Sequence, residues 1–274
     1  MTQTLSLLCI LAHPDDESMG TGGLLAKYAA EGIQTSLVVA TRGERGWQGT
    51  WPGSPAENPG ITALGELREV ELAAAAQVLG LAAVHYLDYV DGELDQADPT
   101  EIIGRLVTHV RKIRPSVVVT FGPDGNYGHP DHIAISQFTT AALVCAADVA
   151  YGDPEGLTPY RVPKLYYFVD TEGMWELLKP YIDGEIGMEV DGVWRQMITW
   201  PAWQVTTRID ADAYWRQALT AVQCHRSQLS TLPPLDELPD AVNAKIWGQH
   251  TLYRAYSLVN GGREVETDLF AGLR

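Results

Sequence analysis

Four apolar runs that alternate with segments of helical periodicity constrain the fold of this chain more than any other feature of its sequence. The runs are rich in Leu, Val and Ile, as expected of strands buried on both faces of a sheet. Strand–helix–strand connections within one sheet are right-handed and make the strands parallel. We therefore expect an α/β fold, with a Rossmann-like, mostly parallel sheet flanked by helices. The predicted strands are 4–12, 36–41, 83–88 and 116–121, and the predicted helices are 19–31, 62–79, 100–113 and one that begins near 131.

After about residue 150 the alternation becomes less regular, although no linker or repeat divides the chain. Segments 164–169 and 204–209 have the composition of strands, and 212–229 has helical periodicity. The 274 residues suffice for one large domain with a sizeable core. We predict a single domain over 1–274, with a core over 1–150, a substrate-shaping insertion near 170–202, and a C-terminal helix and strands over 203–274.

Charge and cysteine content argue against several classes of protein. The net charge of −16 disfavours nucleic acid or an anionic membrane as the main partner, because both require basic patches. No run approaches the roughly 18 apolar residues of a membrane span, and the apolar N-terminus lacks the features of a signal peptide. Cys9, Cys145 and Cys224 form neither a CxxC motif nor a disulfide framework. We therefore expect a protein of the reducing cytoplasm.

Two of the predicted strands are followed by the same kind of polar quartet. HPDD at 13–16 follows the first strand, and HPDH at 129–132 follows the fourth. Proline disfavours helical angles at the histidine before it and suits the first turn of a helix. Each quartet therefore predicts a strand end that turns into a helix start. Ligands of open α/β sheets bind beyond the carboxyl ends of the strands, where both quartets should lie.

The two quartets together provide the ligands of a catalytic metal. Two histidines and one aspartate, such as His13, Asp16 and His132, match a zinc site that leaves a position open for water, whose pKa zinc can lower to about 7. Asp15 is then free to accept the proton of the water. His129 is free to stabilise an oxyanion or to protonate a leaving group, and Asp131 can orient one of the histidines.

The alternative is that each quartet is only a turn with a helix cap. For a single quartet that interpretation would be preferred. Two quartets, each directly after a buried strand, favour the metal site instead.

The sequence resembles the metal-dependent de-N-acetylases of the PIG-L/LmbE type, which include N-acetylglucosaminyl-phosphatidylinositol, mycothiol and bacillithiol deacetylases. The resemblance is strongest over 1–150 and returns near residue 224. Two motifs are specific, and the others are weak when taken alone. The specific motifs are AHPDDE at 12–17 and YGHPDH at 127–132, and the weaker ones are TRGERG at 41–46, LREVE at 67–71, LDYVDGEL at 87–94 and CHRSQ at 224–228.

The resemblance implies a role for each residue of the quartets. It implies a zinc ion (Zn²⁺) on His13, Asp16 and His132, with Fe²⁺ or Co²⁺ as substitutes, and Asp15 as general base. His129 would stabilise the oxyanion or act as the acid, aided by Tyr127. The implied substrate is an N-acetylated amino sugar or glycoside, from which acetate is released.

Other residues allow two interpretations each. Arg68 lies on the same helix face as Glu71, so it either reaches the sugar, as the resemblance suggests, or forms a structural ion pair. Asp91 either binds sugar hydroxyls or is an ordinary turn aspartate before Gly92. His225 fits a core histidine better than a ligand. Trp47 and Trp51, in the long loop 42–61, either stack on a sugar or cover the core.

Several functions remain open at this stage. The same two histidines and carboxylate suit a non-haem Fe(II) oxygenase, although such an enzyme has no use for Asp15. GTGG at 20–23 suggests a nucleotide-binding loop, but Leu25 stands where its last glycine should be. A catalytically inactive relative and an amidase that cleaves a larger thiol-sugar conjugate are further alternatives. The sequence does not identify the aglycone or the meaning of 170–202, and association into a homo-oligomer is compatible with it.

Overall fold

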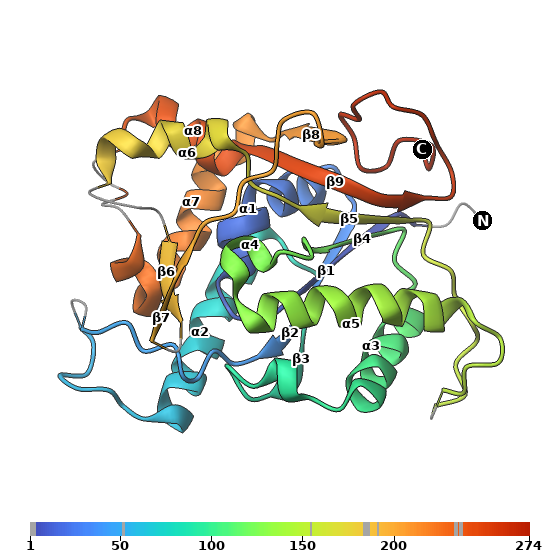
Figure 1. Cartoon of the computed structure of the whole chain (residues 1–274), viewed down its shortest axis with the longest axis horizontal. Helices are drawn as coiled ribbons and strands as arrows, with labels where there is room; N and C mark the ends of the chain where they lie inside the picture. The colour runs from blue at the N-terminus through green and yellow to red at the C-terminus, as the bar shows by residue number, and fades with distance from the viewer. Residues whose placement is uncertain are drawn as a thin grey trace.

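A seven-stranded sheet forms the centre of the molecule. In the computed structural model, which describes residues 4–50, 53–153, 155–182, 187–190, 192–232, 235 and 238–274, the strand order is β3-β2-β1-β4-β5-β9-β8 (Figure 1). The first five strands of that order are parallel, and β9 is antiparallel to both of its neighbours. The α/β fold with a mostly parallel sheet is thus confirmed. The strands are β1 (Ser6–Leu11), β2 (Gln34–Thr41), β3 (Ala83–Tyr89), β4 (Val117–Phe121), β5 (Lys164–Phe168), β8 (Thr207–Asp210) and β9 (Gln249–Ser257).

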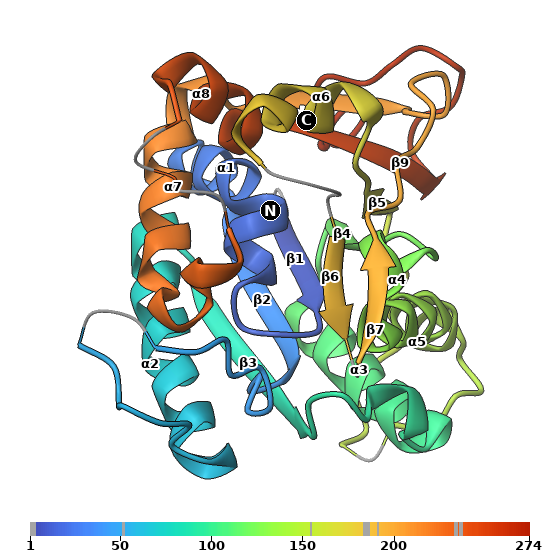
Figure 2. The same cartoon turned by 60° about the vertical axis from the view of Figure 1, so that its left-hand side comes forward.

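Helices cover both faces of the sheet (Figure 2). One layer contains α1 (Asp16–Ala30), α2 (Ile61–Leu79) and α7 (Trp215–Cys224), which pack against one another, and the other contains α3 (Pro99–Ile113) and α5 (Pro130–Ala147). The end of α3 illustrates why these residues form a helix. Pro99 occupies its first turn, and the carboxylate of Asp98 accepts hydrogen bonds from the N–H groups of Thr100 and Glu101.

The direction of the strand order reverses at β1. The chain runs outward from β1 through β2 to β3, and then returns across the sheet to place β4 on the other side of β1. The carboxyl ends of β1 and β4 are therefore adjacent, and a crevice opens between them. Because β1 and β4 are completely buried apolar strands, their ends have fixed positions.

The part of the chain after residue 150 completes this sheet and adds a cover. β5 extends the parallel sheet, and β9 and β8 continue it as antiparallel strands. The predicted insertion contains α6 (Glu172–Leu178) and a separate hairpin of β6 (Gly187–Val190) and β7 (Val193–Gln196). The hairpin contacts α4 (Gly125–Gly128), and α6 contacts α8 (Asp240–Gly248).

Two expectations for this region differ from the structure. The helix expected over 212–229 ends at Cys224, and the chain continues as a short 3₁₀ helix, because His225 has non-helical backbone angles of φ −82° and ψ 57°. The strand expected over 204–209 is shorter and begins at Thr207. No helix among the described residues is long and apolar enough to cross a membrane.

Candidate active site

HPDD lies at the predicted turn between strand and helix, whereas a short helix separates HPDH from its strand. β1 ends at Leu11 and α1 begins at Asp16, so HPDD forms the turn between them. HPDH follows β4 and the short helix α4, and begins α5. His129 is the N-cap of α5, and its Nδ1 accepts a hydrogen bond from the N–H of Asp131 at 3.1 Å. The junction of β1 and α1 therefore positions the polar groups of HPDD, and the junction of α4 and α5 positions those of HPDH.

Three of the predicted ligands come together in space. His13 Nδ1 lies 3.2 Å from His132 Nε2 and 3.7 Å from Asp16 Oδ2. Asp16 Oδ1 lies 3.4 Å from His132 Nε2. One ligand atom from each residue can thus surround a single point, and these atoms all lie within 4.8 Å of one another. The spacing fits a small cation bound by all three side chains.

The outer nitrogen of each histidine faces an acceptor, which directs the inner nitrogens of both rings toward the shared point. His13 Nε2 faces Asp131 Oδ2 at 3.2 Å, and His132 Nδ1 faces the carbonyl oxygen of Gly125 at 3.3 Å. Both outer partners are acceptors, so each outer nitrogen carries the hydrogen in the neutral ring. His13 Nδ1 and His132 Nε2 then face each other at 3.2 Å, an approach that needs either a proton on the His13 ring or a metal ion in its place. The residues present therefore fit a metal ion.

The charges around His13 support the same conclusion. Burial lowers the pKa of His13, but the Asp91 carboxylate and hydrogen bonds to nearby carboxylates raise the pKa well above its usual value. Burial also raises the pKa of Asp16 to about 7, against the opposing charge of His13. The pocket thus concentrates negative charge that a cation would neutralise.

Asp15 lies beside this group and is not needed as a ligand. Its φ of 120° is unusual for a residue other than glycine, and Arg68 Nη2 holds its Oδ2 at 3.1 Å. Burial raises the pKa of Asp15, while the positive charges of Arg68 and then His225 oppose the rise. Strained backbone of this kind is found where the surroundings fix a residue for function.

A buried pair behind Asp15 helps to hold this geometry. Glu17 Oε2 accepts a hydrogen bond from the N–H of Asp15 at 3.0 Å, and its Oε1 lies 2.8 Å from His225 Nε2. Both side chains are fully buried. His225 is therefore a core histidine, as the sequence suggests, but it also supports the turn that carries Asp15.

His129 and Tyr127 line the other side of the metal end. Burial and the charge of His13 lower the pKa of His129 to about 4, so the ring is neutral near pH 7. Since its Nδ1 accepts the N–H of Asp131, its Nε2 carries the hydrogen and can donate it. Tyr127 packs edge-on against the His129 ring, with ring centroids 5.8 Å apart. Burial raises the pKa of Tyr127 well above its usual value, which keeps its hydroxyl protonated.

Asp131 and Asp91 both contact His13. The Asp131 carboxylate also accepts hydrogen bonds from the N–H groups of Gly92 and Leu94 at 2.8 and 3.0 Å. Asp91 Oδ1 lies 3.1 Å from His13 Nε2, and its Oδ2 accepts the N–H of Arg45. A ligand set of His13, His129 and Asp131 is also close enough to hold an ion, but these hydrogen bonds already occupy the Asp131 carboxylate. Asp131 is better suited to orienting His13.

Arg68 and Glu71 do not form an ion pair, which is the structural one of the two interpretations that the sequence leaves open for Arg68. Arg68 Nη1 donates to the carbonyl oxygen of Gly43 at 2.8 Å, and its Nη2 donates to that of Pro14 and to Asp15. Glu71 instead accepts the N–H and the hydroxyl of Ser227, at 2.9 and 2.6 Å. Arg68 therefore clamps the loops around Asp15, which the helix pattern alone could not indicate.

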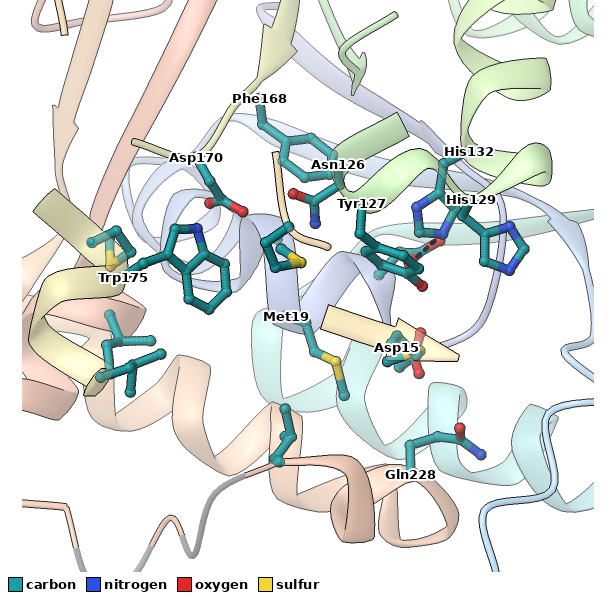
Figure 3. A pocket seen from close by; sticks show the side chains of 18 of the residues that line it. Asp15, Met19, Asn126, Tyr127, His129, His132, Phe168, Asp170, Trp175 and Gln228 are labelled. Carbon is teal, nitrogen blue, oxygen red and sulfur yellow. Dashed lines mark ion pairs between the residues drawn. The ribbon is translucent and has the colours of Figure 1, made fainter. Parts of the chain in front are cut away.

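A cavity of about 560 Å³ opens above these residues. The three proposed ligands, Asp15, Arg68, Asp91, Tyr127 and His129 all line it. Figure 3 shows His129, His132, Tyr127 and Asp15 at one end of the pocket and Trp175 and Asp170 at the other, with Met19 between them. The volume is typical of a site for a small molecule.

Some lining residues were missed by sequence reasoning. Asn126, Gln228 and Asp170 line the cavity without having been singled out. The CHRSQ motif was a signal for Gln228, whereas Asp170 follows β5 with no recognisable motif. Gly46 and Gln48 from the long loop line the cavity, but their neighbour Trp47 is not among the lining residues. Trp51 lies outside the described residues.

The fold and the site define a class: an α/β enzyme with a cluster of two histidines and one aspartate that could hold a metal ion at the carboxyl edge of its sheet. The family described as "PIG-L: GlcNAc-PI de-N-acetylase" matches residues 8–143. The chain is also similar to a 1D-myo-inositol 2-acetamido-2-deoxy-alpha-D-glucopyranoside deacetylase of Kineococcus radiotolerans, with 32% identity over 100% of this chain and 84% of the relative. The chain belongs to the PIG-L family and is a de-N-acetylase.

Solved structures show how widely the fold is used. N,N'-diacetylchitobiose deacetylase from Pyrococcus horikoshii matches 91% of this chain and 83% of its own, with a TM-score of 0.66 and 21% identity. The 4-carboxy-2-hydroxymuconate hydratase GalB from Pseudomonas putida matches 94% of this chain and 99% of its own, with a TM-score of 0.67 and 19% identity. The fold thus supports different reactions, and the assignment of the reaction rests on the family and the site. Membership of the PIG-L family disfavours a non-haem Fe(II) oxygenase and a nucleotide-binding protein as alternatives.

Proposed function

We propose that this enzyme hydrolyses the N-acetyl group of an N-acetylglucosaminyl substrate with a zinc ion held by His13, Asp16 and His132. The observation that carries the proposal is the convergence of ligand atoms from His13, Asp16 and His132 within 4.8 Å of one another, beside the Asp15 carboxylate, which is free to act as a base. The names of the relatives supply the class of substrate.

Zinc in this position would supply a Lewis acid and an activated water at neutral pH. The carboxylate of Asp15 faces the cavity and accepts a proton from the attacking water. As the C–N bond breaks, the same carboxyl group returns that proton to the nitrogen of the leaving amine. Acetate and the free amino sugar are the products, and one proton passes from the water to the amine.

The remaining polar residues act on the substrate and on Asp15. His129 Nε2 donates a hydrogen bond to the developing oxyanion, with Tyr127 as a second donor. Arg68 keeps Asp15 oriented and partly ionised, and Asp91 has an oxygen at the cavity wall for a sugar hydroxyl. Asp131 fixes the ring of His13.

The test combines metal analysis with acetate release. The purified enzyme should contain about one metal ion per chain and release acetate from N-acetylglucosamine or its methyl glycoside. A chelator should abolish release, and added Zn²⁺ should restore it, with Fe²⁺ or Co²⁺ as competing candidates. Enzyme that retains no metal after reconstitution, or that releases acetate equally well without one, would contradict the proposal.

The cellular compartment is part of the proposal. Cys9, Cys145 and Cys224 are all free thiols, as suits a reducing cytoplasm. Association into a homo-oligomer stays a prediction to be tested by measuring the mass in solution.

A further inference from the structure

The cavity continues beyond the metal end into a region with a different chemical character. We call this region the apolar lobe and define it by Met19, Met174, Trp175, Leu178, Leu238 and Trp247, all of which line the cavity. Figure 3 shows Met19 between Asp15 and Trp175, so the lobe begins one helical turn beyond the quartet.

The walls of the lobe belong to a hydrophobic cluster separate from the main core. Leu178, Leu238 and Trp247 are each 6% exposed, and they belong to the same cluster as Met19 and Trp175 rather than to the core of the central sheet. An apolar cavity without contents forgoes dispersion contacts on one side of every lining atom. An apolar group of the substrate would restore those contacts.

The reaction limits which part of the substrate can occupy the apolar lobe. Because the group removed at the metal end is an acetyl group, the acyl part of the substrate is too small to extend into the lobe. The part that can reach it is the aglycone attached to the sugar. A polyol such as inositol would lose hydrogen bonds to water there, since most of the lobe offers no partner.

A few polar groups lie at the boundary of the lobe. Burial, and then the charge of Asp124, raise the pKa of Asp170 to about 7, and the indole N–H of Trp175 has no hydrogen-bond partner. These groups and the unpartnered Nε2 of His250 can pair oxygens at the boundary, but the six side chains of the lobe offer one unpaired N–H for the five free hydroxyls of a glycosylated inositol.

We infer that the apolar lobe binds a hydrophobic aglycone, an alkyl or aryl group, so that the preferred substrates are apolar glycosides of N-acetylglucosamine. This inference rests on the proposed function, because it assumes that the N-acetyl group occupies the metal end.

The test is a series of N-acetylglucosaminides of one anomeric configuration with methyl, butyl and octyl aglycones, together with the inositol glycoside. Acetate release gives kcat/KM for each. Each buried methylene is worth up to about fourfold, so butyl should exceed methyl by roughly tenfold or more. The gain should level off once the lobe is filled, and octyl should exceed inositol.

Replacing a methionine of the lobe by glutamine, a polar side chain of similar length, tests whether the aglycone binds in the apolar lobe. Met174→Gln should lower the octyl-to-methyl ratio of kcat/KM about tenfold by placing an amide in the lobe. Met188→Gln, on β6 at the cavity wall, gives a second variant should the first fail to fold. The matched control is Val193→Gln on β7, where the side chain is 52% exposed and does not line the cavity; it should keep the wild-type ratio.

The outcomes separate this inference from the proposed function. Equal kcat/KM for methyl and octyl glycosides, or a preference for inositol, would overturn the hydrophobic aglycone while leaving deacetylation intact. Faster cleavage of an N-octanoyl than of an N-acetyl sugar would overturn it too, by assigning the lobe to the acyl group. Absence of acetate release from every glycoside, methyl included, would overturn the proposed function itself.

Discussion

The metal end of the cavity and the apolar lobe are built in opposite ways. The metal end is made by two strand ends and by carboxylates whose oxygens are each held by backbone N–H groups or side chains, as at Asp16 and Asp131. The lobe is made by side chains from α1, α6, α8 and the segment before α8, which contribute contact area and few hydrogen bonds. The metal end therefore holds individual atoms in defined positions for the reaction, whereas the apolar lobe determines only the size and the polarity of the group that can bind there.

Removing a proposed metal ligand should give the largest loss of activity, because the metal end depends on the fixed positions of three side chains. His132→Ala deletes one of three proposed ligands, so the enzyme should lose its metal and its activity should fall below detection. Metal analysis after dialysis and acetate release measure both. His109→Ala, which changes another histidine far from the cavity, should retain both; full metal content in His132→Ala would contradict the ligand assignment.

Asp15→Asn should give the next largest effect. Asparagine keeps the shape of the side chain but cannot accept the proton, so kcat should fall about a thousandfold, within the range for general acid–base groups. Metal content should stay near one ion per chain. Loss of metal would make Asp15 a ligand and remove it as the base. Asp95→Asn, at an exposed position, is the matched control.

His129→Ala should reduce kcat about a hundredfold, because one hydrogen-bond donor to the oxyanion is lost. His129→Gln, which still offers an N–H, should recover part of that loss. Both variants remove the Nδ1 that caps α5, so a difference in kcat between them reports the role of His129 as a hydrogen-bond donor and not its role as a cap. Equal activity of the two variants would argue for the cap alone.

A smaller effect should show that the cavity wall next to Trp247 of the apolar lobe does not tolerate a charge. His250 lines the cavity, and burial lowers its pKa to about 4. Below pH 6.5 His250 binds a proton in the unfolded chain, whereas in the folded chain it stays neutral until the pH approaches 4. The free energy of unfolding should therefore fall as pH drops from 6.5 to 4, by up to about 3 kcal/mol from this group.

The variant His250→Gln should show a shallower dependence over that pH range, as measured by urea unfolding. The control is Asp95→Asn, at an exposed position, which should keep the wild-type dependence. An unchanged pH dependence in His250→Gln would mean that the histidine is protonated in the folded chain and that this part of the cavity wall tolerates its charge.

The contrast between the two ends also explains what the sequence could predict. The quartets carry their own structural signals, because an apolar strand and an X-Pro dipeptide place His13 and His132 locally. Parallel strands then bring them to one edge without further information. The central sheet and its first four strands could be predicted for the same reason.

Other features depend on partners far away in the sequence. β9 is a half-buried strand with mixed polar residues, and its position in the sheet is set by pairing with β5 and β8. The break at His225 follows from its pairing with Glu17, some 208 residues away, against a local pattern that favours helix. The apolar lobe has no motif at all, because any hydrophobic side chain of suitable size could line it.

The backbone of Asp15 has a consequence for how this family can change over time. A φ of 120° costs an aspartate of the order of 1–3 kcal/mol, whereas glycine adopts it freely. Selection for a stable fold and selection for turnover therefore oppose each other at this one position. A descendant with glycine here would relieve the backbone, lose the base and still look well folded, so inactive members could persist unnoticed beside active ones.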